Sequence, residues 1–198
     1  SGDFVRHPVS HFFIPFWDAM DRERFDLIGY NASPVRDDIT DYLESGSSLW
    51  RDIDDISDTE LADQIYNDNI DILIDLSGHT TYCRLPMFGL RPAPVQMTWI
   101  GYPATTGMKA IDYRIVPDTI LNVPKMQEQF SEHLLYVRME KTFEPNEQSP
   151  DVSELPAIKN GYITFCSFNR PKKINNDVLN VWASILLRLP NAKLMIGF

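Results

Sequence analysis

Three positive charges stand close together in the last third of a chain that is otherwise acidic. Arg170, Lys172 and Lys173 follow a short apolar run and precede a stretch with helical spacing of apolar residues. Cationic side chains beside the exposed N–H groups of a helix start are typical of a phosphate-binding site. Short basic clusters are also common in solvated surface turns, so the pattern leaves both interpretations open.

A histidine near the N-terminus is the candidate for proton transfer. His7 precedes Pro8, and proline is favoured at the first position of a helix, so His7 is predicted to cap a helix. The positive end of the helix dipole favours the neutral imidazole, which is the form that a general base needs. The alternative is a histidine that only caps the helix. Pro15 is expected to kink or split this helix.

Two further polar segments each follow an apolar, strand-like run. The first contains Ser77, Gly78 and His79, and the second begins with Gly101 and ends with Gly107. Hydroxyl groups and free backbone N–H groups at a strand end can bind a polar ligand, and glycine allows the backbone to approach it closely. A generic loop has the same composition, so this signal is weaker than the cationic cluster.

The elements that position these residues are predicted from hydrophobic periodicity. Strands are expected at Phe25–Tyr30, Ile70–Leu76, Val95–Ile100, Tyr113–Val116, Gly161–Ser167 and Ala192–Phe198. Helices are expected at Ser57–Asn67, where Ser57 and Glu60 fit a capping box, and at Asp177–Leu189. Alternating strands and helices indicate an α/β fold with a mostly parallel sheet, and ligands bind at the carboxyl edge of such sheets.

A change of composition divides the chain. Residues 146–160 are rich in Pro, Asn, Gln, Ser and Glu and are predicted to be a linker. It would join a first α/β lobe at residues 1–145 to the start of a second α/β lobe at residues 161–198. A strand, a helix and a strand cannot cover a sheet alone, so the second lobe is expected to be truncated and its apolar surface to drive self-association.

Composition excludes several classes of protein. The formal net charge of -10 argues against a nucleic-acid backbone binder. Because no apolar run approaches the roughly 18 residues of a membrane span and no signal pattern is present, we expect no membrane partner and a cytoplasmic location. The two cysteines lack ligand spacing, and the triplet Asp52–Asp54 is expected by chance in an acidic chain. No metal and no cofactor are therefore predicted.

Several motifs in this order resemble the catalytic region of the O-linked N-acetylglucosaminyltransferase family, the SPINDLY-like glycosyltransferases, in a bacterial-type version. They are Ser1-Gly2-Asp3-Phe4 with His7-Pro8, Asp75-Leu76-Ser77-Gly78-His79-Thr80, Arg91-Pro92-Ala93-Pro94, Gly101-Tyr102-Pro103, and Phe165-Cys166-Ser167-Phe168-Asn169 with Lys173-Ile174. The resemblance implies a GT-B architecture of two Rossmann-like lobes, with the N-terminal catalytic lobe at residues 1–145 and the start of the C-terminal nucleotide-binding lobe at residues 161–198. It also implies inverting transfer of N-acetylglucosamine from UDP-GlcNAc to Ser or Thr hydroxyls of acceptor proteins, without a metal.

The resemblance also implies roles for individual residues. His7 falls on the family's active-site histidine, which has been proposed as the base, and Lys173 on the lysine that holds the UDP phosphates. Ile100, Gly101 and Pro103 fall on residues that line the sugar pocket. The remaining predicted substrate-binding residues lie at the same strand ends and are Tyr102, His79, Asn169 and Arg170.

Two rival classes stay open. A different UDP-sugar enzyme, such as an epimerase, needs an acidic catalytic pair near the sugar pocket, and no predicted strand end carries one. A non-enzymatic interaction module could keep the fold and lose the site, which resemblance of fold alone never excludes. A serine hydrolase is not favoured, because the chain has no GxSxG motif.

Overall fold

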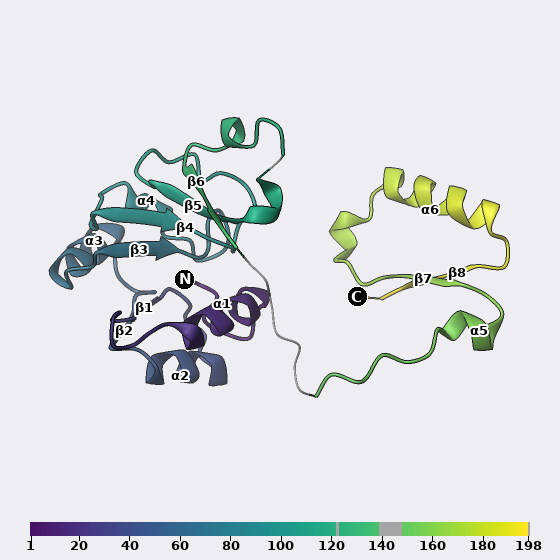
Figure 1. Cartoon of the computed structure of the whole chain (residues 1–198), viewed down its shortest axis with the longest axis horizontal. Helices are drawn as coiled ribbons and strands as arrows, with labels where there is room; N and C mark the ends of the chain where they lie inside the picture. The colour runs from purple at the N-terminus through teal and green to yellow at the C-terminus, as the bar shows by residue number, and fades with distance from the viewer. Residues whose placement is uncertain (122, 139–147, 198) are drawn as a thin grey trace. The chain divides into compact units, whose positions relative to one another are not determined.

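The computed structural model describes residues 1–121, 123–138 and 148–197. The chain divides into two compact units, Ser1–Pro145 and Asn146–Phe198 (Figure 1). The first two residues of the predicted linker and the last residue of the final predicted strand lie outside the described residues. Each unit is described by itself below.

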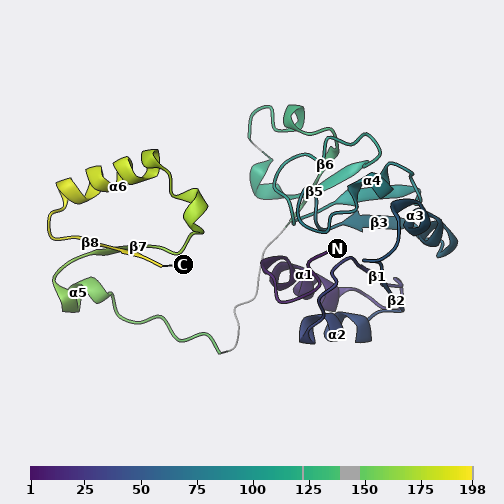
Figure 2. The same ribbon diagram turned by 180° about the vertical axis from the view of Figure 1, so that it is seen from behind.

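The first unit contains two parallel sheets (Figures 1 and 2). The smaller sheet pairs β1 (Ile28–Asn31) with β2 (Leu49–Asp52). The larger sheet has the order β3-β4-β5-β6, with strands at Ile72–Asp75, Val95–Thr98, Tyr113–Pro117 and His133–Val137. Every strand pair in these sheets is parallel, which confirms the predicted α/β class. Asp75 pairs with Thr98, so β3 and β4 end side by side.

The helices of this unit follow their local signals. They are α1 (Pro8–Ala19), α2 (Asp38–Ser45), α3 (Asp58–Asn67) and α4 (Leu85–Phe88), with short 3-10 turns at Asp118–Ile120 and Gln127–Gln129. The capping box predicted at Ser57 and Glu60 is confirmed. Helix α1 continues through Pro15, so the expectation of a split is wrong, whereas the alternative of a kink stays a prediction. A proline ring crowds the carbonyl four residues earlier, and here that residue, His11, is exposed to water.

In the first unit, four α-helices or strands are absent from the sequence prediction, namely α2, β2, α4 and β6. One predicted strand also begins too early. Only Thr40 and Leu43 of α2 are buried, so its apolar periodicity is too sparse to recognise. In β2 and β6 no residue is fully buried, and both strands contain charged or polar residues. The strand predicted from Phe25 begins at Ile28, since Phe25 is exposed.

One of the two apolar cores fixes the N-terminal segment against the larger sheet. Phe4, Val9, Phe13 and Trp17 pack with Leu76, which follows β3, and with Leu43 of α2. The rings of Phe4 and Phe13 lie 5.6 Å apart and tilted, a favourable geometry for aromatic pairs. This core holds the beginning of α1 beside the carboxyl end of β3.

The second unit is a small α/β layer. It contains α5 (Pro156–Asn160), β7 (Thr164–Ser167), a 3-10 turn (Pro171–Lys173), α6 (Asn176–Arg188) and β8 (Lys193–Ile196), and β7 pairs with β8 in parallel. The last part of the predicted linker is helical: Pro156 begins α5, since proline suits the first helical turn. In the described residues, no helix is long and apolar enough to cross a membrane.

Candidate functional site

The N-terminal segment is attached to the turn that follows β3. The Gly2 N–H donates to the Ser77 hydroxyl at 3.2 Å. The buried Ser10 hydroxyl, from the first turn of α1, lies 2.5 Å from the Asp3 carbonyl and 2.7 Å from that of Val5. These contacts tie the segment that leads to His7 both to the first turn of α1 and to the turn at the carboxyl end of β3.

His7 caps α1, as predicted. Its Nδ1 accepts a hydrogen bond from the Val9 N–H at 3.3 Å, and the Asp3 Oδ1 lies 3.5 Å from the same nitrogen. A neutral imidazole that accepts at Nδ1 carries its proton on Nε2. Burial raises the pKa of the Asp3 carboxyl, and the charge of His7 opposes that rise. Nδ1 therefore has two competing partners, an N–H donor and a carboxylate.

The turn after β3 is closed by a buried carboxylate. Asp75 accepts hydrogen bonds from the N–H groups of Ser77 and Gly78 and from the Thr98 hydroxyl at 2.8 Å. Gly78 has a φ of +58°, and a Cβ there would lie 2.3 Å from the Cβ of Tyr102. Only glycine satisfies both the backbone angle and the close contact. The turn that carries His79 is thus locked to β4 and to the segment after it.

The segment after β4 packs its backbone directly on that turn. A Cβ at Gly101 would lie 1.8 Å from the Leu76 carbonyl oxygen, so glycine is required there by close approach. The preceding residue, Ile100, has a φ of +59°, which is strained for a β-branched side chain. The Tyr102 ring meets the His79 ring edge to face, with centroids 5.3 Å apart. The structure therefore brings Ile100, Gly101, Tyr102 and His79 together.

Two buried charged residues that support this segment were missed by the sequence prediction. Arg114 of β5 donates to the carbonyl groups of Tyr102 and Ala104, the latter at 2.9 Å. Glu132, which precedes β6 and is fully buried, accepts from the Thr106 N–H and hydroxyl and from the Thr105 hydroxyl. An acidic residue in an acidic chain gives no sequence signal, and β6 itself was not predicted.

The electrostatics of both residues follow from burial. Burial alone would raise the pKa of Glu132, but hydrogen bonds from Thr106 and Thr105 outweigh it, so this pKa is lowered and the carboxylate stays charged. Burial lowers the pKa of Arg114, partly offset by the charge of Glu132. The two opposite charges thus bind neighbouring parts of the same backbone segment, Arg114 at Tyr102 and Ala104 and Glu132 at Thr105 and Thr106.

The remaining predicted residues form a separate group in the second unit. Asn169, Arg170 and Lys173 lie between β7 and α6, and all three are exposed. The Arg170 carbonyl accepts from the Lys173 N–H at 2.9 Å, which closes a 3-10 turn. Helix α6 then starts at Asn176, with Asn175 as its cap. The predicted arrangement of cations just before a helix is confirmed, whereas their role in binding phosphate stays a prediction.

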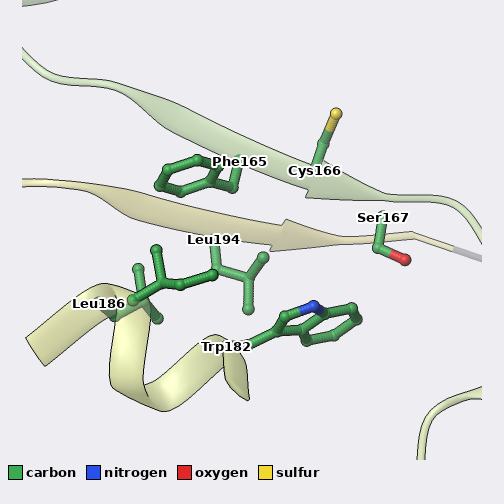
Figure 3. A pocket seen from close by; sticks show the side chains of 7 residues that line it. Phe165, Cys166, Ser167, Trp182, Leu186 and Leu194 are labelled. Carbon is green, nitrogen blue, oxygen red and sulfur yellow. The ribbon is translucent and has the colours of Figure 1, made fainter. Parts of the chain in front are cut away.

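A cavity of about 180 Å³ lies between α6 and the sheet of the second unit (Figure 3). Its lining is mainly apolar: Phe165, Cys166, Ser167, Trp182, Ile185, Leu186 and Leu194. Among the described residues, the Ser167 hydroxyl has no hydrogen-bond partner. None of the predicted site residues lines this cavity, so it is a gap in the apolar packing beside α6.

The described part of the chain contains no group of three or more His, Cys, Asp or Glu side chains that could hold a metal ion. Asp52, the first residue of the Asp52–Asp54 triplet, is engaged in structural contacts. Asp52 accepts from the Asn31 side chain at 2.9 Å and from the Arg36 guanidinium at 2.8 Å. These bonds explain its position at the end of β2 without a metal.

Known proteins resemble the chain in both sequence and structure. A family model described as Glycosyl transferase family 41 matches residues 1–147. The probable UDP-N-acetylglucosamine--peptide N-acetylglucosaminyltransferase SPINDLY of Petunia hybrida is 38% identical over 203 residues, covering 99% of the chain and 22% of that relative. The probable UDP-N-acetylglucosamine--peptide N-acetylglucosaminyltransferase SEC of Arabidopsis thaliana is 30% identical over 208 residues, covering 98% of the chain and 21% of that relative.

A solved structure is similar to the chain in fold over almost the whole length of the chain. The K341M mutant of the Thermobaculum terrenum O-GlcNAc transferase matches with a TM-score of 0.87 and 39% identity, over 99% of this chain and 37% of that one. This similarity confirms the predicted Rossmann-like lobe of a GT-B glycosyltransferase. The chain spans about a fifth of the length of the curated relatives that it matches.

Proposed function

Because the chain belongs to glycosyl transferase family 41, we propose that it is part of an inverting glycosyltransferase that moves N-acetylglucosamine from UDP-GlcNAc to Ser or Thr hydroxyls of proteins. The observation that carries the proposal is that the N-terminal segment leading to His7 is bonded to the turn after β3, and that this turn, which carries His79, packs against the 100–103 segment at the carboxyl ends of β3 and β4. Ligands of open α/β sheets bind at this edge. A cytoplasmic location and a protein acceptor belong to the same proposal.

The sugar is assigned to the first unit. The backbone at Ile100 and Gly101 is fixed by the contact of Gly101 with the Leu76 backbone. Tyr102 and Pro103 follow directly in the same segment and are assigned to the same sugar pocket. Sugar hydroxyls need hydrogen-bond partners in a fixed geometry, and a backbone held on both sides supplies them with little loss of entropy. His79 adds a polar ring beside Tyr102.

The diphosphate is assigned to the second unit. Lys173 and Arg170, with Asn169, stand exposed before the N-terminus of α6, where fixed cations can hold phosphate oxygens. In the reaction, the acceptor oxygen forms a bond to the anomeric carbon while the bond from that carbon to the phosphate oxygen breaks. Negative charge develops on the departing UDP, and cations placed there stabilise it.

His7 is assigned to the acceptor hydroxyl. To receive the hydroxyl proton at Nε2, the neutral ring must carry its own proton on Nδ1. Asp3, 3.5 Å from Nδ1, is the group that can hold the proton there, in place of the bond from the Val9 N–H. With the proton on Nε2 instead, His7 donates a hydrogen bond to substrate and does not act as a base.

Calorimetric titration of UDP into the chain tests the phosphate assignment. We expect binding that is lost in Lys173→Ala and retained in Lys159→Ala, an exposed lysine of α5 in the same unit that serves as the matched control. Equal affinity of the two variants contradicts the assignment. In a form of the protein that shows transfer, His7→Ala should abolish turnover without changing UDP affinity, and unchanged turnover would favour a non-enzymatic module.

A further inference from the structure

Residues 100–107 form a loop without helix or strand, and this 100–107 loop carries most of the proposed sugar pocket. Something outside the loop must therefore fix it. Its first half rests on Leu76 and is held by Arg114. Its second half is held by Glu132, which lies about 25 residues further along the chain.

Glu132 holds the loop through both carboxylate oxygens. Oε1 accepts from the Thr106 N–H at 2.7 Å and from the Thr106 hydroxyl, and Oε2 accepts from the Thr105 hydroxyl at 2.7 Å. The Glu132 side chain is fully buried and Thr106 is 5% exposed, so water cannot replace the bonds between these two residues. A buried donor that loses its acceptor carries the full free-energy cost of desolvation. Loss of the Glu132 carboxylate would therefore destabilise this conformation of Thr106 as a whole.

Thr106 transmits this constraint to His79. The Thr106 N–H points to Glu132, while its carbonyl oxygen lies 2.8 Å from His79 Nε2. A carbonyl oxygen only accepts, so the His79 proton is on Nε2 and the Nδ1 lone pair of the neutral ring remains available. The ring of His79 also contacts the ring of Tyr102 edge to face, so the orientation of His79 is linked to the first half of the loop as well.

We propose that Glu132 is a positioning residue for the sugar pocket: by fixing Thr106 it sets the ring orientation and the tautomer of His79, whose Nδ1 accepts a hydrogen bond from a sugar hydroxyl. The contact with sugar rests on the proposed function. The fixed loop and tautomer do not, because they follow from contacts within the first unit.

Nuclear magnetic resonance of the ¹⁵N-labelled chain tests the inference without a ligand. In the wild type, His79 should be in the Nε2–H form and the Thr106 amide should exchange slowly. Glu132→Gln should give a mixture of tautomers and exchange of the Thr106 amide at least about tenfold faster. Glu128→Gln, an exposed glutamate of the preceding 3-10 turn, is the matched control and should change neither. Wild-type behaviour of Glu132→Gln overturns the inference.

A second variant covers the case in which Glu132→Gln does not fold. Thr105→Val removes the bond to Oε2, and with it the acceptor of the Gly107 and Ser131 N–H groups and the contact with the Ser131 hydroxyl, at a residue that is partly exposed. It should speed exchange of the Thr106 and Gly107 amides, and unchanged exchange of Thr106 overturns the inference. Titration with UDP-GlcNAc and with UDP separates the two proposals: if neither binds the wild type, the proposed function fails while the amide and tautomer results still decide the role of Glu132.

Discussion

Replacement of Gly101 by alanine tests whether the close contact between the 100–107 loop and the turn after β3 builds the site. The new Cβ would lie 1.8 Å from the Leu76 carbonyl oxygen, 2.7 Å from the Leu76 carbonyl carbon and 3.0 Å from the Ser77 Cα. A relaxed contact between carbon and oxygen needs about 3.3 Å, so the backbones must separate by about 1.5 Å. No flexible side chain can absorb this shift, because the nearest atoms all belong to the backbone.

The magnitude follows from overpacking at a backbone contact, and we expect Gly101→Ala to lower the free energy of unfolding of the first unit by about 3 kcal/mol. Gly107→Ala is the matched control on the same loop. A Cβ there meets nothing within 4 Å, and only its φ of +71° is unfavourable. We expect that variant to cost about 1 kcal/mol.

Urea unfolding followed by tryptophan fluorescence measures both costs, since Trp17, Trp50 and Trp99 all lie in the first unit. Gly101→Ala should also weaken binding of UDP-GlcNAc while leaving UDP affinity unchanged, because the phosphate site is assigned to the other unit. If the two glycine variants lose the same stability, or if Gly101→Ala weakens UDP and UDP-GlcNAc equally, the close-contact argument is refuted.

Three other outcomes are expected. Ser57→Ala should destabilise the first unit by about 1 kcal/mol in urea unfolding, because it removes the cap of α3. Hydrogen bonds, chiefly from Arg51, lower the pKa of Asp68 in the folded state. The charged carboxylate therefore stabilises the fold fully above the ordinary aspartate pKa, and this stabilisation is lost as pH falls through the lower pKa of the folded state. Asp68→Asn should thus flatten the fall in the free energy of unfolding between about pH 5 and pH 2, as measured by urea unfolding. The chain should self-associate through exposed apolar residues of the second unit, such as Phe168 and Leu187, and light scattering that finds only a monomer contradicts this.

The sequence alone determined the features that depend on short-range patterns. Apolar runs located β3, β4 and β5, and the spacing of Ser57 and Glu60 identified the cap of α3. The Pro8 signal identified His7 as the cap of α1. Alternation of elements fixed the α/β class, and the motifs identified the family. Each of these signals is encoded within a few residues of where it acts.

Only the tertiary structure decided how the site is held. Arg114 and Glu132 act on a loop that is distant from them in sequence, and a charge becomes a buried anchor only when the fold supplies its partners. Likewise, glycine is required at position 101 because the Leu76 carbonyl lies against it. This contact joins the ends of two different strands, so no local sequence pattern predicts it. The sequence determines which chemical groups the candidate residues carry. Their orientation depends on contacts that exist only after the sheet has formed.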